Sequence, residues 1–199
     1  MAGPAKQFDQ QDALKKALEV FWDKGYEATS MQDLVNHMGI NRASMYDTFG
    51  SKYELFKQSL DAYCQQSLVN IKQVLGEPGS ALQNIVRYYQ LLGSSTGMVK
   101  HHGCFINNTA VELGPHKPEI ADYIRQHWSA VEALFESTLD RAVEQGELHP
   151  DTDTASLARL FNTLIQGLAV SSKVQIPQKY RSSVVKTVFQ ILRAAHAKD

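Results

Sequence analysis

The stretch from residue 29 to residue 55 constrains the fold most, because it holds several helix starts in close succession. Ser30 with Asp33, and Ser51 with Glu54, have the spacing of a capping box, in which each side chain bonds the other residue's backbone amide. Each pair therefore predicts a helix that begins at the next residue. Starts so close together leave room only for short helices between them.

A turn centred on Gly39 separates two of these short helices. Asn41 can cap the second one, and Ile40 and Met45 stand at the two ends of a hydrophobic staple. Two short helices joined by three or four residues with a glycine in the turn form a helix-turn-helix, which places its second helix in the major groove of DNA. The stretch therefore predicts a DNA-reading element.

The rest of the chain repeats its apolar residues with the period of a helix and shows no alternating strand pattern. We expect an all-α protein of about nine helices: 9–25, 30–39, 41–49, 51–75, 80–94, 104–113, 118–146, 153–173 and 178–197. Residues 1–55 form the predicted three-helix, helix-turn-helix DNA-binding domain. Residues 56–199 form a second, larger helical domain, and the boundary lies within the fourth helix.

The composition limits the class of protein. The chain has 199 residues, of which 43% are hydrophobic, and a formal net charge of -1. Near-neutral charge argues against a non-specific nucleic-acid coat, so a few placed cations must make any DNA contact. The chain has neither the apolar run of a secretory signal nor a membrane span, and its two cysteines are far apart. We expect a cytoplasmic protein without a membrane association, a disulfide framework or a cofactor.

The second helix of the pair presents an outward face suited to DNA. Helical spacing turns Met45 and Phe49 inward and leaves neighbouring side chains outside. Arg42 can fork onto guanine or a phosphate. Ala43 allows contact with a thymine methyl, and Ser44 can donate to a base edge or a phosphate.

Lys52 lies in the first turn of a helix, where a positive charge opposes the helix dipole. Such a placement makes sense if an anion binds there, because free backbone amides and an ammonium together form a phosphate site. The same reasoning applies to Thr29 and Ser30 at the start of an earlier helix. Ordinary helix caps and a solvated lysine are the alternative.

Residues 9–56 resemble the DNA-binding region of TetR/AcrR-family regulators. The matching segments are Thr29-Ser30-x-x-Asp33-Leu34, Gly39-Ile40-Asn41 and Met45-Tyr46-x-x-Phe49-Gly50-Ser51-Lys52-x-x-Leu55-Phe56. The resemblance implies that Thr29, Tyr46 and Lys52 contact phosphates, while Arg42, Ala43 and Ser44 approach bases. Asp47 departs from the His or Tyr common at that position; it can accept from a cytosine amine or turn aside, so its role stays open.

The last two predicted helices carry apolar faces broader than one internal contact needs. We expect a homodimer built as a four-helix bundle, although an internal core is the alternative. The resemblance adds support, and Gly167 would let a second backbone approach. The predicted dimerisation residues are Leu157, Leu160, Phe161, Leu164, Leu168, Val184, Val188, Phe189 and Leu192.

By resemblance, the second domain encloses a cavity for a small-molecule effector, and each candidate wall residue could equally be plain core. The candidates are Tyr88, Tyr89, Leu92, Cys104, Phe105, Asn108, Trp128, Phe161 and Gln166. Cys104 supports a further hypothesis, a thiol that senses electrophiles or oxidants, with its pKa lowered by the helix start and by His101 and His102. Its alternative is a small buried apolar residue.

The predicted function is a one-component transcription regulator, a repressor rather than an activator, that binds a near-palindromic double-stranded operator. A helical enzyme or ligand carrier and a scaffold without DNA binding are the competing classes. His101, His102, Cys104 and His116 have no recurring ligand spacing, so we expect no metal site. The chain also lacks a nucleophile elbow, a phosphate-binding loop and a zinc-protease signature, so we expect no enzyme.

Overall fold

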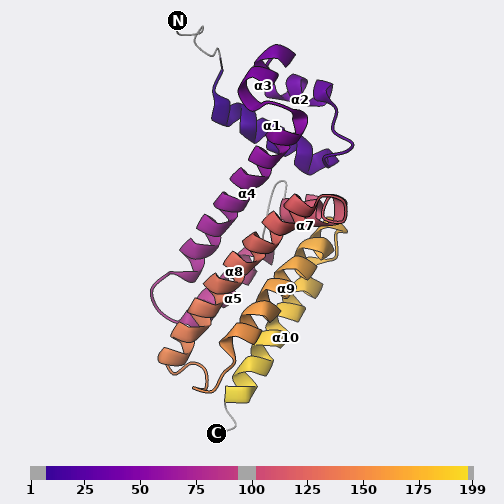
Figure 1. Ribbon diagram of the computed structural model, residues 1–199. Helices are drawn as coiled ribbons and strands as arrows, with labels where there is room; N and C mark the ends of the chain where they lie inside the picture. The colour runs from indigo at the N-terminus through magenta and orange to yellow at the C-terminus, as the bar shows by residue number, and fades with distance from the viewer. Residues whose placement is uncertain (1–7, 94–101, 197–199) are drawn as a thin grey trace, which may run out of the picture.

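The structure is a computed structural model that describes residues 8–93 and 102–196. That part of the chain is built from helices and contains no strand (Figure 1). Helices α1 (Gln10–Lys24), α2 (Met31–Met38) and α3 (Arg42–Phe49) form a compact unit at one end of the molecule. The long helix α4 (Lys52–Leu75) starts in this unit and runs away from it into the larger region. The predicted all-α fold is confirmed.

Short-range capping explains where the first helices begin. Asp9 caps α1 by accepting from the backbone amides of Gln11 and Asp12 at 2.8 and 3.1 Å. Complete capping boxes open α2 and α4, at Ser30 and Ser51. These are the starts that the residue pattern predicts.

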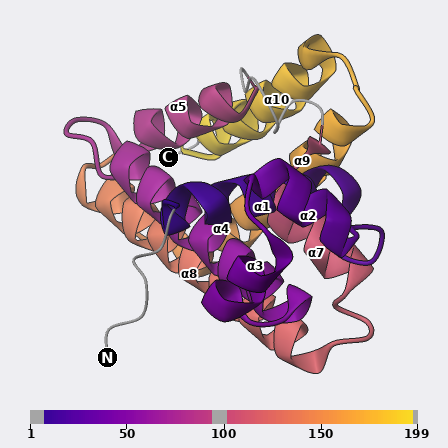
Figure 2. The same cartoon turned by 90° about the horizontal axis from the view of Figure 1, so that it is seen from above.

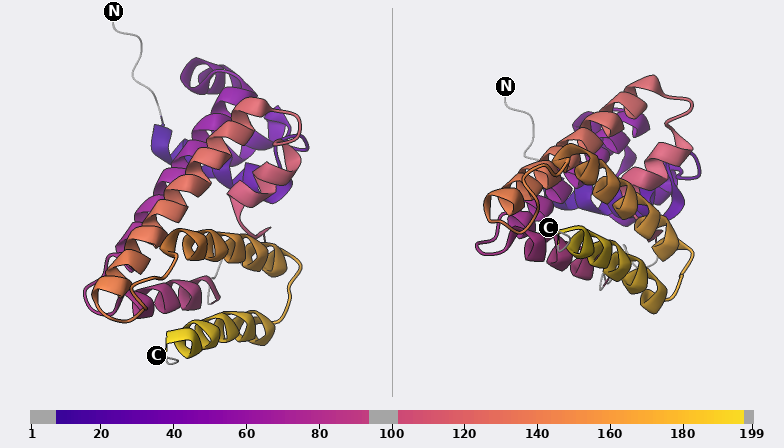
Figure 3. Two further views of the ribbon diagram at one scale, coloured as in Figure 1. Left: turned by 60° about the horizontal axis from the view of Figure 1, so that its bottom comes forward. Right: turned by 90° about the horizontal axis from the view of Figure 1, so that it is seen from below.

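The larger region holds α5 (Ala81–Gly93), α7 (Phe105–Glu112), α8 (Pro118–Glu144), α9 (Thr154–Lys173) and α10 (Gln178–His196). Helix α9 packs across α8, and α10 packs against α5 (Figure 3). Seen from the end that carries the short helices, α5 and α10 lie on one side of the molecule, with α1, α4 and α7 on the other (Figure 2). No helix in the described ranges is long and apolar enough to cross a membrane.

Two hydrophobic clusters hold these elements together. The first joins the short helices and upper α4 to α7 and the start of α8, around the rings of Phe21, Phe56 and Phe105. The second lies around Phe135 and Phe161, between lower α4, α5, α8, α9 and α10. Helix α7 is therefore packed into the same core as the helix-turn-helix. The predicted division at residues 55 and 56 stays a prediction.

Candidate nucleic-acid interface and ligand cavity

The turn between α2 and α3 has the expected helix-turn-helix geometry. Gly39 ends α2 in the left-handed region, with φ 70°, and Asn41 caps α3 by accepting from the Ser44 amide at 2.8 Å. Met45 and Phe49 are buried and anchor α3 to the first core. The opposite face of α3 is thereby left to solvent.

That outer face carries the residues expected to contact DNA. Arg42, Ala43 and Asp47 are exposed, and the Tyr46 side chain is 42% exposed. The Arg42 guanidinium lies 5.7 Å from the centroid of the Tyr46 ring, and its Nη2 donates to the Tyr46 hydroxyl at 3.5 Å. Ser44 is half-buried at the start of the helix. The face therefore offers a cation supported by an aromatic ring, beside a small residue that permits close approach.

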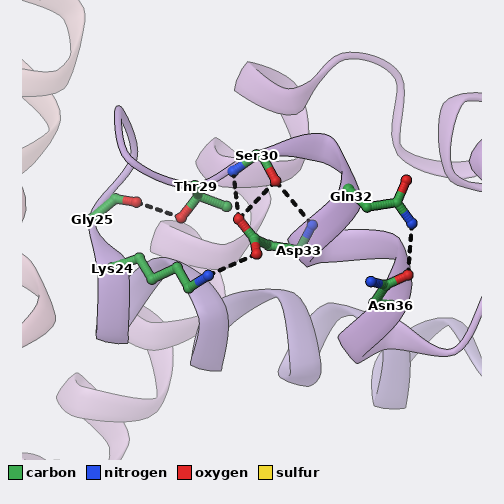
Figure 4. A network of polar contacts seen from close by, with 7 residues as sticks. All are labelled: Lys24, Gly25, Thr29, Ser30, Gln32, Asp33 and Asn36. Carbon is green, nitrogen blue, oxygen red and sulfur yellow. Dashed lines mark hydrogen bonds and ion pairs between the residues drawn. The ribbon is translucent and has the colours of Figure 1, made fainter.

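Ser30 opens α2 within a network of polar contacts (Figure 4). Its hydroxyl accepts from the Asp33 amide at 3.1 Å and donates to Asp33 Oδ2 at 2.7 Å. Lys24 Nζ donates to Asp33 Oδ1 at 2.7 Å, and this bond, followed by those from Ser30, holds the pKa of Asp33 far below its ordinary value. The network fixes the start of α2 while leaving Ser30 exposed.

The structure corrects the expectation for Thr29. Its side chain is 1% exposed, and its hydroxyl donates to the Gly25 carbonyl at 2.5 Å (Figure 4). A phosphate cannot reach a hydroxyl buried in this way. Thr29 instead closes the turn between α1 and α2.

Lys52 also has a partner that the sequence did not reveal. Its ammonium lies 4.4 Å from the centroid of the Tyr26 ring, and this cation–π contact offsets the unfavourable helix dipole without a bound anion. The side chain is nevertheless partly exposed at the start of α4. Lys57 and Lys117 lie over the Tyr53 ring at 5.0 and 5.5 Å, which adds two further cations to this end of the molecule.

A large cavity of about 1320 Å³ lies between α1, α4, α5, α8, α9 and α10. Predicted wall residues that do line it are Tyr88, Tyr89, Leu92, Cys104, Trp128 and Gln166. Sequence reasoning missed other wall residues, among them Trp22, His127 and Arg181. Nothing in their spacing marks them, because they come from three helices far apart in the chain.

Three predicted wall residues lie elsewhere, and their assignment is corrected. Phe105 is buried in the first core, edge-on to Phe56 and Tyr63. Phe161 is buried in the second core and stacks on Phe135. Asn108 donates to the His102 carbonyl at 2.8 Å and accepts from Lys173 at 3.1 Å, so it joins α7 to α9.

Cys104 lies at the start of α7 in the cavity wall, with the Tyr63 hydroxyl 3.7 Å from its sulfur. Burial raises the pKa of the Cys104 thiol, so the expected lowering is wrong. His102 Nδ1 lies 3.3 Å from Asp23 Oδ1, and His101 is outside the described residues. No group of three His, Cys, Asp or Glu side chains in the described ranges could hold a metal ion.

Glu112, at the last turn of α7, binds the turn that follows α1. Its two carboxylate oxygens accept from the backbone amides of Tyr26 at 3.1 Å and Glu27 at 2.9 Å. A third hydrogen bond joins the segment before α7 to α1, because Trp22 Nε1 donates to the Gly103 carbonyl at 3.1 Å. The cavity-lining segment is thus bonded directly to the helix-turn-helix unit.

The predicted dimerisation residues divide into inner and outer sets. Phe161 and Phe189 are buried within their own chain, and Leu168 and Phe189 line the cavity, so their assignment to a dimer face is corrected. Leu160 is 47% exposed. The half-buried members are Leu157, Leu164, Val184 and Val188, and the side chain of Leu192 lies outside the described residues.

Three exposed residues that the prediction omitted extend the outer set. Val170, Val174 and Tyr180 are more than half exposed, at 55%, 65% and 62%. Gly167 lies on the same side of α9, and a methyl group added there would meet nothing within 4 Å. The open apolar face of α9 is therefore Leu160, Gly167, Val170 and Val174, followed by Tyr180 at the start of α10.

Comparison with known proteins agrees with both regions. Residues 13–58 match the model of bacterial regulatory proteins of the tetR family, and residues 80–188 match the tetracyclin repressor-like C-terminal domain. The uncharacterized HTH-type transcriptional regulator YezE of Bacillus subtilis (strain 168) is 38% identical over 174 residues, which cover 86% of this chain and 90% of that protein. The HTH-type transcriptional repressor ComR of Escherichia coli (strain K12) is 31% identical, over 86% of this chain and 82% of ComR.

A solved structure agrees in fold over nearly the whole length. The TetR family transcriptional regulator CifR, a cysteine mutant complexed with 26 bp double-strand operator DNA, superposes with a TM-score of 0.83 at 30% identity, covering 94% of this chain and 98% of that one. The helix-turn-helix geometry, the two family matches and these relatives lead to one conclusion. The chain belongs to the TetR family of bacterial regulatory proteins.

Proposed function

We propose that this protein is a repressor that binds a near-palindromic operator as a homodimer and is released by a small-molecule effector. The exposed face of α3, with Arg42 held against Tyr46, is the observation that carries the proposal. The relative ComR is named a repressor, and CifR was solved with operator DNA. Arg42, Ala43 and Ser44 are the proposed base contacts, and Ser30, Tyr46 and Lys52 are the proposed phosphate contacts.

The homodimer follows from the low charge of the DNA-binding unit. Few cations face outward, so one unit would bind DNA weakly, and two-fold symmetry would place a second α3 in the next major groove. The open face of α9 and the start of α10 is the proposed interface, because it exposes Leu160, Val170 and Tyr180. Gly167 permits close approach of the partner helix.

Helix α7 is the proposed connection between effector and DNA. It begins at the cavity, and its far end bonds the turn after α1 through Glu112. An effector that prefers a conformation with mis-spaced α3 helices would shift the population away from DNA. A coupling free energy of ~1–3 kcal/mol is sufficient for control.

Titration of the protein against DNA from upstream of its own gene tests the proposal. Arg42→Ala should weaken specific binding by ~1–3 kcal/mol and relax sequence preference. Lys52→Ala should weaken binding to all sequences evenly and flatten the salt dependence. Lys72→Ala is the matched control, an exposed lysine near the other end of the same helix. Specific binding that survives both changes at the level of the control would contradict the proposed interface.

A thiol switch at Cys104 is a second candidate, favoured by the position of the sulfur in the cavity wall. Its raised pKa leaves little thiolate at neutral pH, which opposes the idea. Alkylation mass spectrometry, with DNA binding assayed in parallel, decides whether Cys104 is a thiol switch or an inert wall residue. Cys64, which is buried and has its pKa raised to about 12, provides the control variant Cys64→Ser. A Cys104→Ser protein that still responds to electrophiles rules the switch out.

A further inference from the structure

The cavity walls are mainly apolar and aromatic. Trp22, Trp128 and Tyr88 line it, together with aliphatic side chains such as Ile71 and Val131. The volume of about 1320 Å³ is larger than the roughly 300–1,000 Å³ of common ligand pockets. An occupant that covers this surface must have a large apolar body.

The charges in the wall are all of one sign. No Asp or Glu is among the described residues that line the cavity, whereas Lys15, Arg181, Lys186 and Arg193 all do. The chain as a whole has 21 acidic and 20 basic residues, so composition does not explain the bias. Within the described ranges none of these four cations forms an ion pair; Lys15, Lys186 and Arg193 are exposed to water, and Arg181 is half-buried. Glu132 accepts from the lining residue Asn162 at 3.0 Å but is not itself in the wall.

Two lining residues also keep a buried nitrogen without a partner in the described part of the protein. They are Arg181, at Nε, and His127, at Nδ1, whose side chain is only 7% exposed. Arg181 uses one other nitrogen to donate to Ser172 Oγ. Burial lowers the pKa of His127, so its ring stays neutral and adds no charge. A buried polar atom without a partner is costly, so both nitrogens favour a ligand that can bond them.

We infer that this cavity binds an amphipathic organic anion, whose acidic head is held by Arg181 and Ser172 while its apolar body lies along the aromatic wall. The guanidinium presents a planar fork that suits a carboxylate. An anion there would compensate the cationic wall, whereas an organic cation would meet four like charges and no acid. This inference rests on the proposed function, because it names the chemical class of the proposed effector.

Three probes with the same twelve-carbon chain separate the alternatives: dodecanoate, dodecanol and dodecyltrimethylammonium, each used below the concentration at which it aggregates. Both tryptophans of the chain line the cavity, so intrinsic fluorescence reports its occupancy without any DNA. We expect dodecanoate to bind most tightly, and Arg181→Gln to weaken it about tenfold or more, since it removes a charge-assisted bond. Dodecanol should bind the variant as it binds the wild type, which shows that the cavity remains intact. Lys179→Gln, an exposed neighbour outside the wall, is the matched control.

Binding of the cation at least as tightly as dodecanoate overturns the inference, as does a failure of all three probes to change the fluorescence. An equal loss of dodecanoate affinity in Arg181→Gln and Lys179→Gln also overturns it, because it shows only a general surface charge effect. Release of DNA is measured separately. If dodecanoate binds through Arg181 and the operator complex stays intact, the inference stands and the proposed effector control fails.

Discussion

The bonds from Glu112 to the turn after α1 give the sharpest stability prediction. Glu112→Ala removes both carboxylate oxygens and leaves the amides of Tyr26 and Glu27 without their acceptors. The Tyr26 amide is partly buried, so water replaces its lost partner poorly, whereas the Glu27 amide is more exposed. The cost should therefore come mainly from one amide.

A hydrogen bond to a charged group contributes ~1.5–3 kcal/mol, and an orphaned buried donor costs ~1–3 kcal/mol. Because one of the two amides regains water, we expect Glu112→Ala to lower the free energy of unfolding by about 1–3 kcal/mol in all. Glu112→Gln keeps one acceptor oxygen but turns an amide nitrogen toward the other donor. Its free energy of unfolding should therefore lie between those of the alanine variant and the wild type.

Urea unfolding at one fixed protein concentration measures these changes, because the stability of the proposed dimer would depend on concentration. Glu144→Gln is the control, an exposed glutamate on α8, and should change stability by less than about 0.5 kcal/mol. Glu112→Ala should also weaken any effect of a cavity ligand on DNA affinity, since α7 then loses a direct bond to the helix-turn-helix unit.

A double-mutant cycle with Gly25 isolates the contact. Gly25 has φ +82°, and a methyl group added there would lie 2.9 Å from both Glu112 oxygens. Gly25→Ala should destabilise through backbone strain and this clash, and only the clash should disappear when Glu112 is also alanine. The assigned contact is refuted if the losses of stability in Gly25→Ala and Glu112→Ala are simply additive in the double variant. It is also refuted if Glu112→Ala is as stable as the control Glu144→Gln.

Three further predictions follow from other contacts. If the protein is the proposed dimer, Leu160→Glu on the open face of α9 should convert it to monomers and abolish operator binding, as seen by light scattering and gel shift. Thr29→Val should destabilise by about 1–2 kcal/mol, since the Gly25 carbonyl loses its donor, while DNA affinity of the folded protein stays unchanged. The pKa of Asp33 is lower in the folded protein than the ordinary aspartate pKa of about 3.9, so its ionised carboxylate stabilises the fold at pH values above that value. This stabilisation is lost as the pH falls from about 3.9 toward the folded-state pKa. The stability of Asp33→Asn should therefore depend less steeply on pH in acid unfolding.

The predicted helices agree with the structure because their signals are local. Asp9, Ser30, Asn41 and Ser51 each cap the helix expected of them, and every bond involved joins residues no more than three positions apart. Such contacts can be recognised in a short stretch of sequence. The same is true of the inward Met45 and the outward face of α3.

The errors arise where a distant partner decides the role of a residue. Thr29 and Ser30 are neighbours of the same chemistry, and only tertiary packing buries the first and exposes the second. Helix α9 is apolar on more than one side, so periodicity alone could not show that Phe161 faces its own core while Leu160 faces out. Glu112 had no predicted role, because its partners lie 85 and 86 positions earlier in the chain.

The continuity of α4 sets the size of movement that control requires. Its 24 residues span about 36 Å at 1.5 Å per residue, from the partly exposed Lys52 to the second core. A tilt of about 5° at the cavity end would displace the other end by roughly 3 Å. Hydrogen bonds tolerate only a few tenths of an ångström, so this displacement would carry a phosphate contact out of range. The proposed effector therefore need not unfold or separate any element, because a tilt of about 5° at the cavity end would be enough to disengage the proposed phosphate contact at the other end.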